Sequence, residues 1–307
     1  MAEEYGKATV KGTKIRYQEV ALDYIRISKF KIISLLDFVA ISALLVAGGP
    51  SVSIQTILAL FAAGTLASAG AEAFNAYLDR DIDSVMARTM KRPIPLGRIN
   101  PPVRALQFGT VMITMAAVIS LTMLNVLSTA MILLGAFTYI VVYTIVLKRR
   151  TSWNIVLGGF AGSFAALAGW AAATNSINLP ALLMAFLIFL WTPSHFWSLA
   201  VLTNRDYKTA GIPMLPAIVG EKKASKYIVL NTLLLIPFSL LFYFLGYSGL
   251  VYLTITSIVG LLLLITNIKM LKEPSMSNSW TAFKFSSPYL AIVFSAMVLD
   301  ALLRDWK

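Results

Sequence analysis

Apolar stretches long enough to cross a bilayer recur along this chain, and they limit its fold more than any other feature. About nine can be drawn, each close to the roughly 20 residues that a helix needs to span the hydrocarbon core. They lie near residues 32–49, 54–78, 105–124, 130–147, 155–173, 179–201, 226–246, 250–268 and 286–303. With 58% hydrophobic and 13% charged residues, the chain is too apolar for a soluble domain. We therefore predict an all-α, polytopic membrane protein with about nine transmembrane helices.

Lysine and arginine are confined to alternate loops between these stretches. All of the 26 except Arg304 and Lys307 lie before the first stretch or in the loops after the second, fourth, sixth and eighth. Because cytoplasmic loops retain positive residues, this alternation predicts that the N-terminus lies in the cytoplasm. Topology thus explains most of the net charge of +12, and we expect no nucleic-acid partner.

We divide the chain into three parts. Residues 1–31 are polar and basic, and residues 17–30 have the pattern of an amphipathic helix lying on the membrane surface. Residues 32–303 form the membrane domain, and residues 304–307 a short tail. Within the domain we expect a four-plus-four helix pseudo-repeat with a ninth helix appended, because the second and sixth spans end alike. Given its polar start, we expect the chain to insert by its first span, without a signal peptide.

The end of the second span, EAFNAYLDRDIDSVMARTMKRPIPLGR, carries a row of polar side chains out of the apolar region. On a continuous helix, Asn75, Asp79 and Asp83 lie on one stripe with Glu72, because residues four apart share a face. Mg²⁺ binds one or two carboxylates and leaves other positions to phosphate and water. The chain has no cysteine, which disfavours zinc and copper. The stripe therefore predicts a magnesium site, with Asp81 pointing away as a solvated or salt-bridged carboxylate.

Basic residues gather on the same side of the membrane as this row. Arginine can bind phosphate through two parallel hydrogen bonds, and lysine adds a compact charge. Such residues also flank ordinary spans for topology alone, but beside an aligned carboxylate row they predict diphosphate binding. The candidates are Arg88, Lys91 and Arg92 after the second span, and Lys148, Arg149 and Arg150 after the fourth.

The sixth span ends in WTPSHFWSLAVLTNRDYKTAGIPMLP, which carries a second group of candidates. His195, the only histidine in the chain, stands two residues after Pro193, which we expect to loosen the helix. A histidine at a helix end is often only hydrogen-bonded, but one within a span is a functional candidate. Asp206 follows at the same end as the first row, so both motifs are expected on one face.

These motifs resemble the UbiA-type intramembrane prenyltransferases, and among them the protoheme IX farnesyltransferases, or heme O synthases. The N-x-x-x-D-x-x-x-D pattern at Asn75, Asp79 and Asp83 is that of the superfamily. The narrower similarity rests on DRDIDSVMARTMKRPIPLGR, YTIVLKRRTSWNIVLGGFAGSFAALAGW, WTPSHFWSLAV and DYKTAGIPMLP, within residues 29–220. The resemblance implies a UbiA-type fold, with the helices arranged around a central cavity.

The resemblance also implies a reaction. A farnesyl group would pass from farnesyl diphosphate to a vinyl group of protoheme IX with addition of water, giving heme O and diphosphate. Asn75, Asp79, Asp83 and Asp206 would hold Mg²⁺ on the diphosphate, and the six basic residues would bind its phosphates. His195 would face the heme, as an axial ligand or a proton acceptor. Heme is then a substrate, membrane lipids surround the enzyme, and a heme A synthase would act downstream.

Three departures from the family pattern affect these expectations. Lys29-Phe30-Lys31 replaces the usual Lys-Pro-Arg, so we expect the first helix to begin without its proline. Ala165-Ala166 replaces Pro-Pro in the fifth span, which predicts a straighter helix and a changed heme pocket. The second motif keeps one aspartate where the wider superfamily has two, as heme O synthases do.

Two other functions fit part of the pattern. A UbiA-type enzyme could act on a quinone-precursor ring or a glycerophosphate lipid, and such an enzyme would not need His195. A transporter would show inverted repeats and helix breaks at mid-membrane, whereas here the carboxylates gather at one interface. For the prenyl-transfer reading, aromatic faces could stabilise an allylic cation, although each could equally be a core or interface residue. The candidates are Tyr77, Tyr139, Tyr143, Trp191 and Trp197.

Overall fold

The computed structural model describes residues 17–305, and all regular secondary structure in this part is helical. Nine helical stretches in it are long and apolar enough to cross a membrane, as predicted. They are α2 (Phe30–Gly48) with η1 (Gly49–Ser51), α3 (Ile54–Leu78), α5 (Arg104–Met123), α6 (Val126–Phe137) with η2 (Thr138–Leu147), α7 (Asn154–Gly158) with α8 (Phe160–Thr174), α9 (Leu179–Leu202), α12 (Glu221–Phe244), α13 (Leu250–Lys272) and α14 (Met276–Asp305).

Four shorter helices lie outside the spans. They are α1 (Tyr17–Ser28), α4 (Arg80–Val85), α10 (Asn204–Thr209) and α11 (Leu215–Val219). The amphipathic helix expected over residues 17–30 is therefore present as α1, while the lysines and arginine of residues 1–16 and the end of the tail, residues 306–307, fall outside the described part.

Span boundaries differ most from the prediction at the last helix. α14 begins at Met276, whereas the apolar run was drawn from residue 286. The added turns contain Ser277, Asn278, Ser279 and Lys284, which lower the local hydropathy without breaking the helix. Pro288 lies inside α14, and Pro193 lies inside α9 without ending that helix. Neighbouring helices make such prolines tolerable within a span.

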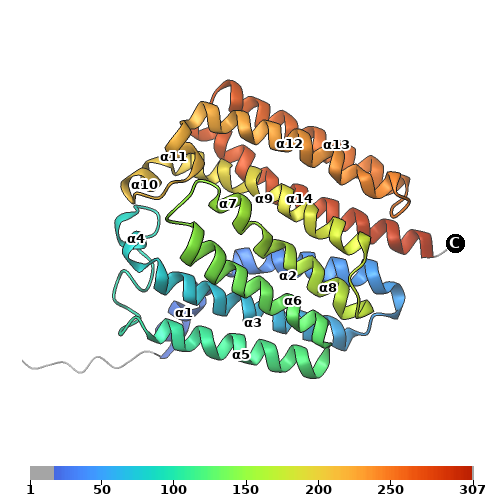
Figure 1. Cartoon of the computed structure of the whole chain (residues 1–307), viewed down its shortest axis with the longest axis horizontal. Helices are drawn as coiled ribbons and strands as arrows, with labels where there is room; N and C mark the ends of the chain where they lie inside the picture. Colours follow the sequence, from blue (N-terminus) through green and yellow to red (C-terminus); the bar gives the residue numbers. More distant parts are fainter. Residues whose placement is uncertain (1–16, 306–307) are drawn as a thin grey trace, which may run out of the picture.

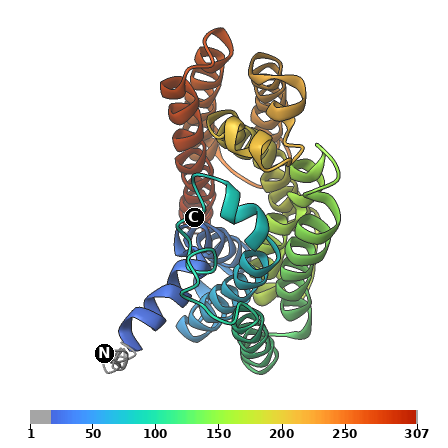
Figure 2. The same cartoon turned by 90° about the vertical axis from the view of Figure 1, so that its left-hand side faces the viewer.

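The spans form a bundle, and the long connections that contain α4, α10 and α11 lie at one end of it (Figure 1). α2, α8, α9, α12, α13 and α14 enclose the largest buried apolar cluster, and α3 packs along α5 and α6 beside it. Figure 2, which looks onto the left-hand end of Figure 1, shows α4, α10 and α11 lying across that end. The ends of α3 and α9 are thus brought to the same face of the bundle.

Glycines in α8 allow neighbouring helices to approach closely. A Cβ built on Gly169 would lie 1.9 Å from the carbonyl oxygen of Ala40 on α2, so only glycine fits this crossing. A Cβ on Gly162 of the same helix would lie 3.3 Å from a methyl group of Ile188, which can move. The α2–α8 contact therefore depends on Gly169 far more than on Gly162.

The two glycines form a matched pair for a stability test. We expect Gly169→Ala to lower the free energy of unfolding by about 1 to 3 kcal/mol, because the added methyl group must push two backbones apart. Gly162→Ala should have a much smaller effect. Thermal unfolding of both variants in one detergent checks this, and equal midpoints would contradict the close contact.

Candidate functional site

The predicted stripe at the end of the second span is present, although the helix that carries it is interrupted. α3 ends at Leu78 and α4 begins at Arg80, so the expected continuous helix is broken at Asp79. The backbone amide of Asp79 still bonds Asn75 O at 2.9 Å, and that of Asp83 bonds Asp79 O at 2.7 Å. The four-residue register is thereby retained, and all three side chains are buried.

Each aspartate of the stripe is paired with a cation from a different segment. Lys148, directly after η2, forms an ion pair with Asp79, and the two side chains are 13% and 1% exposed. One guanidinium nitrogen of Arg92 donates to both oxygens of Asp83, at 2.9 and 2.7 Å. Lys148 and Arg92 were both predicted to bind phosphate, and in this structure they form ion pairs with the carboxylates.

A third cation, Lys29, lies at the buried start of the stripe. It was not among the predicted site residues. Its ammonium group pairs with Glu72 and donates to Asn75 Oδ1 at 3.1 Å. Lys29 lies between α1 and α2 with a φ of 52°, and α2 begins at Phe30 without the family's proline, as expected. Burial lowers the pKa of the Lys29 ammonium, and the Glu72 carboxylate opposes that shift.

The π-helical segment η2 places further side chains beside the stripe. The Thr144 hydroxyl donates to Tyr139 O, five residues back, at 2.8 Å, and Asn75 Nδ2 donates to the same hydroxyl at 3.2 Å. The rings of Tyr139 and Tyr143 stack with centroids 5.6 Å apart, and Lys148 Nζ lies 5.8 Å from the Tyr143 centroid. π-Helical turns often occur at functional sites. No pattern in the sequence predicts that η2 is π-helical.

Asp206 of the second motif lies at the same end as the stripe. Its Oδ2 accepts a hydrogen bond of 3.2 Å from the backbone amide of Arg88. A buried cluster that includes Ile82 of α4 and Trp197 of α9 packs the two motif regions together. Within residues 17–305, however, no three His, Cys, Asp or Glu residues are close enough to form a metal cage. The four predicted ligands therefore share one face without forming a closed ligand set.

The other predicted phosphate-binding residues lie nearer to water. Arg149 donates to the two oxygens of Asp81 at 2.7 and 2.6 Å, which confirms a salt bridge for Asp81. These bonds lower the pKa of the Asp81 carboxyl to about 2. The side chains of this pair are 41% and 62% exposed, so the bridge contributes little to stability. Arg88, Lys91 and Arg150 are exposed.

One buried oxygen of the stripe has no hydrogen-bond partner in the described structure. Asp79 Oδ1 is buried and makes no hydrogen bond in the described structure, while Oδ2 of the same carboxylate is bonded by Asn75 and Lys148. A buried carboxylate oxygen without a partner is costly. The predicted ligands Asn75, Asp79 and Asp83 offer amide and carboxylate oxygens, which suit Mg²⁺. The residues thus fit a hard divalent cation.

His195 lies in the bundle between aromatic rings from α9 and α14. Its ring stacks on Trp191, with centroids 4.4 Å apart and planes at 19°, and lies 4.7 Å from the Phe283 ring. Its Nδ1 is 2.6 Å from Ser286 Oγ. Among the predicted aromatic residues, Trp191 therefore contacts His195. Tyr77 contacts Arg80, whose guanidinium carbon lies 4.3 Å from the centre of the Tyr77 ring.

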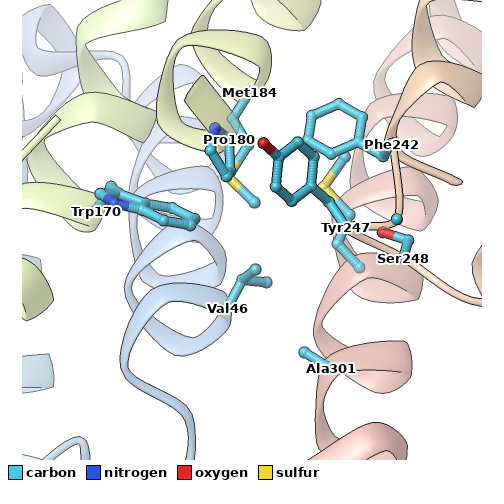
Figure 3. Close-up of a pocket in the computed structure, with 10 residues that line it drawn as sticks. Val46, Trp170, Pro180, Met184, Phe242, Tyr247, Ser248 and Ala301 are labelled. Atoms are coloured by element: carbon cyan, nitrogen blue, oxygen red, sulfur yellow. The ribbon is translucent and has the colours of Figure 1, made fainter. Parts of the chain in front are cut away.

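A cavity of about 230 Å³ lies at the other end of the bundle and is separate from this site. Figure 3 shows Trp170, Met184, Phe242 and Tyr247 around it. Its lining comes from the ends of α2, α12 and α14 and the start of α9, whereas Asp206 follows the end of α9. The ion-paired stripe and this cavity therefore lie at opposite ends of the bundle.

Comparison with known proteins gives a family and several full-length relatives. The model of the UbiA prenyltransferase family matches residues 36–288. A protein of Cenarchaeum symbiosum named protoheme IX farnesyltransferase 1 is 46% identical, with 92% of this chain and 96% of that one aligned. Proteins named protoheme IX farnesyltransferase from Sulfurisphaera tokodaii and Desulforudis audaxviator are 42% and 39% identical, covering 92% and 94% of this chain and 94% and 91% of theirs.

Solved structures show the same fold at lower identity. A digeranylgeranylglyceryl phosphate synthase aligns with a TM-score of 0.75 and 21% identity, over 93% of this chain and 99% of that one. A UbiA homolog from Archaeoglobus fulgidus, bound to GPP and Mg²⁺, aligns with a TM-score of 0.65 and 16% identity, over 90% and 99%. At these identities the likeness concerns the fold alone.

The difference between the buried and the exposed ion pair can be measured without substrate. Lys148→Met leaves the Asp79 charge buried and unpaired, and we expect it to lower the free energy of unfolding by roughly 3 to 5 kcal/mol. Arg149→Met breaks the exposed pair and should cost about 0 to 1 kcal/mol. Adding Asp79→Asn to Lys148→Met should restore part of the loss. Thermal unfolding in detergent tests all three, and equal effects of the two single changes would refute the distinction.

Proposed function

The chain belongs to the UbiA prenyltransferase family, and from this membership we propose that it is a protoheme IX farnesyltransferase. It would transfer the farnesyl group of farnesyl diphosphate to a vinyl group of protoheme IX, with addition of water, giving heme O and diphosphate. The observation that carries the proposal is the shared name of relatives that align with nearly the whole chain. The buried polar stripe and the single histidine supply suitable groups for the two substrates.

The donor site would be the stripe at the end of α3. Asn75, Asp79, Asp83 and Asp206 would hold Mg²⁺, which neutralises the charge that grows on the departing diphosphate. The unpartnered Oδ1 of Asp79 and the oxygen-only donor set support this assignment. The A. fulgidus homolog with bound Mg²⁺ supports it for the fold.

When the donor binds, the basic residues that pair with the stripe would exchange their carboxylate partners for phosphate oxygens. Lys148 and Arg92 already lie on Asp79 and Asp83, so a short side-chain movement would bring them to a diphosphate between the aspartates. Arg88, Lys91 and Arg150 are exposed at the same end and would approach from the water side. Arg149 pairs with Asp81, which lies on the exposed side away from the stripe, so its contribution should be the smallest of the set.

Bond breaking and bond making would then follow in the bundle. The C–O bond of the donor breaks, its electron pair leaves with the diphosphate, and an allylic cation remains. The stacked rings of Tyr139 and Tyr143, beside the stripe, offer their faces to that cation. The heme vinyl carbon forms the new C–C bond, and the carbocation left on the acceptor takes up water and releases a proton. His195 would hold the acceptor in place.

The protein's place in the cell follows from its charge distribution. We propose a multi-pass protein of the cell membrane with its N-terminus and its active site at the cytoplasmic face. Loops rich in lysine and arginine lie at the end of the bundle that carries the stripe, and such loops remain cytoplasmic. Farnesyl diphosphate and protoheme IX would be its substrates, membrane lipids its surroundings, and a heme A synthase the enzyme that uses its product.

The other acceptors find less support. The structural neighbour that makes a glycerophosphate lipid shares 21% identity, which shows only the fold. The relatives of higher identity carry the heme-directed name. A transporter is disfavoured because the ionisable stripe lies at one end of the bundle rather than at its middle.

Extracted heme tests the reaction directly. The chain expressed in a host that lacks heme O synthesis should yield a heme heavier than protoheme by one farnesyl group and one water, detected by mass spectrometry. A prenylated quinone precursor or lipid with unmodified heme would overturn the proposal in favour of the alternative acceptor.

The stripe offers its own control for the donor site. Asp83→Asn should lower heme O formation by about 10²-fold or more, because it removes a charge facing the metal and diphosphate. Asp81→Asn, two residues away on the exposed side, should change it by no more than about 3-fold, in keeping with an exposed ion pair. Chelation of Mg²⁺ by EDTA should stop the unaltered enzyme. Similar losses in both variants would argue against the stripe.

A further inference from the structure

We propose that Ser286 is a positioning residue that fixes the tautomer of His195, leaving Nε2 of the imidazole unprotonated and available to the iron of the heme substrate. The inference rests on the proposed function for the identity of the acceptor. The tautomer itself follows from hydrogen bonds within the protein.

The hydroxyl group of Ser286 stands between two partners. Ser286 Oγ lies 2.7 Å from the carbonyl oxygen of Phe283, to which it donates, and 2.6 Å from His195 Nδ1. A hydroxyl has one proton to give and can accept two hydrogen bonds. Because the carbonyl oxygen brings no proton, both short contacts are hydrogen bonds at the same time only when the serine proton points to Phe283. In that arrangement the bond to His195 runs from Nδ1–H to the serine oxygen.

The imidazole is held in this orientation by its neighbours. Trp191 stacks on one side of the ring, and the Phe283 ring lies 4.7 Å away at 31°. Trp191 also donates its indole N–H to the carbonyl oxygen of Ser286 at 2.8 Å. The same α14 residue is therefore bonded to both α9 side chains, and His195 and Ser286 are 9% and 2% exposed. Rotation of the ring would break this arrangement.

Nε2 is left free by the same geometry. Apart from the contact with Ser286, no hydrogen bond of the His195 ring occurs in the described part of the chain. Nε2 is also not among the fully enclosed polar atoms without a partner in residues 17–305. A neutral imidazole that donates from one nitrogen and presents the other is the form that binds metals, and the partner of the donating nitrogen sets which one is presented.

The single histidine makes the tautomer directly observable. In full-length, heme-free protein labelled with ¹⁵N-histidine, the only imidazole signals come from His195. We expect a protonated, pyrrole-type Nδ1 and an unprotonated, pyridine-type Nε2 near neutral pH. In Ser286→Ala the Nδ1–H form should lose its predominance, and in Ser286→Thr it should be retained. A protonated Nε2 in the unaltered protein would overturn the proposal.

Heme binding gives a second readout, also without catalysis. Titration of the purified protein with ferric protoheme, followed by the Soret band and by electron paramagnetic resonance, reports affinity and axial ligation. Ser286→Ala should weaken binding by about 10-fold or more and change the ligation signature, as loss of a partner of a ligating histidine does. Ser286→Thr should keep both. Ser287→Ala, the half-buried neighbour on α14, is the matched control and should bind like the unaltered protein.

The outcomes separate this inference from the proposed reaction. If Ser286→Ala binds heme with unchanged affinity and spectrum, the positioning role is refuted, even when heme O is formed. If the unaltered protein makes no heme O, the proposed function fails. The tautomer of His195 is measured in heme-free protein, so that result is tested separately. Thermal unfolding of each variant identifies a loss of heme binding that arises from misfolding. If Ser286→Ala misfolds, Ser286→Thr replaces it as the test, and loss of heme binding in a folded Ser286→Thr variant would refute the positioning role.

Discussion

Buried ion pairs at the end of α3 are the interaction on which the rest of this structure depends. Moving a charge out of water costs several kcal/mol per ion, so Asp79 and Asp83 can be buried only where cations reach them. Lys148 and Arg92 do so from the end of η2 and from the loop after α4. The pairs therefore fix where these segments lie. Lys29 has the same effect on the junction of α1 and α2.

The same charges prepare the stripe for its proposed substrate. A site built to hold a metal and a diphosphate needs acidic and basic groups together, and without ligand these groups neutralise each other. The match is incomplete, because Asp79 Oδ1 has no hydrogen-bond partner in the described structure. A buried carboxylate oxygen without a partner is a local conflict of the kind that occurs at functional sites. The stability of the fold and the proposed ligand binding thus depend on the same charged residues.

The two proposed substrate groups are positioned by different means. The donor end is held by electrostatics at the edge of the bundle, with short helices and a π-helical segment. His195 is held by ring stacking and a hydroxyl within the helices α9 and α14. A histidine held among packed helices and an ionic donor site at the end of the bundle would suit a reaction in which one charged group must leave.

The sequence by itself determined the nine spans, the four-residue stripe and the outward position of Asp81, because hydropathy and helical spacing are local properties. It also identified Asp206 and His195 as candidates. Only the tertiary structure decided that Lys29 joins the stripe, that Lys148 rather than Arg149 pairs with Asp79, and that η2 is π-helical. Ser286 meets His195 across 91 residues of chain. Such pairings depend on how distant segments cross, which no local pattern records.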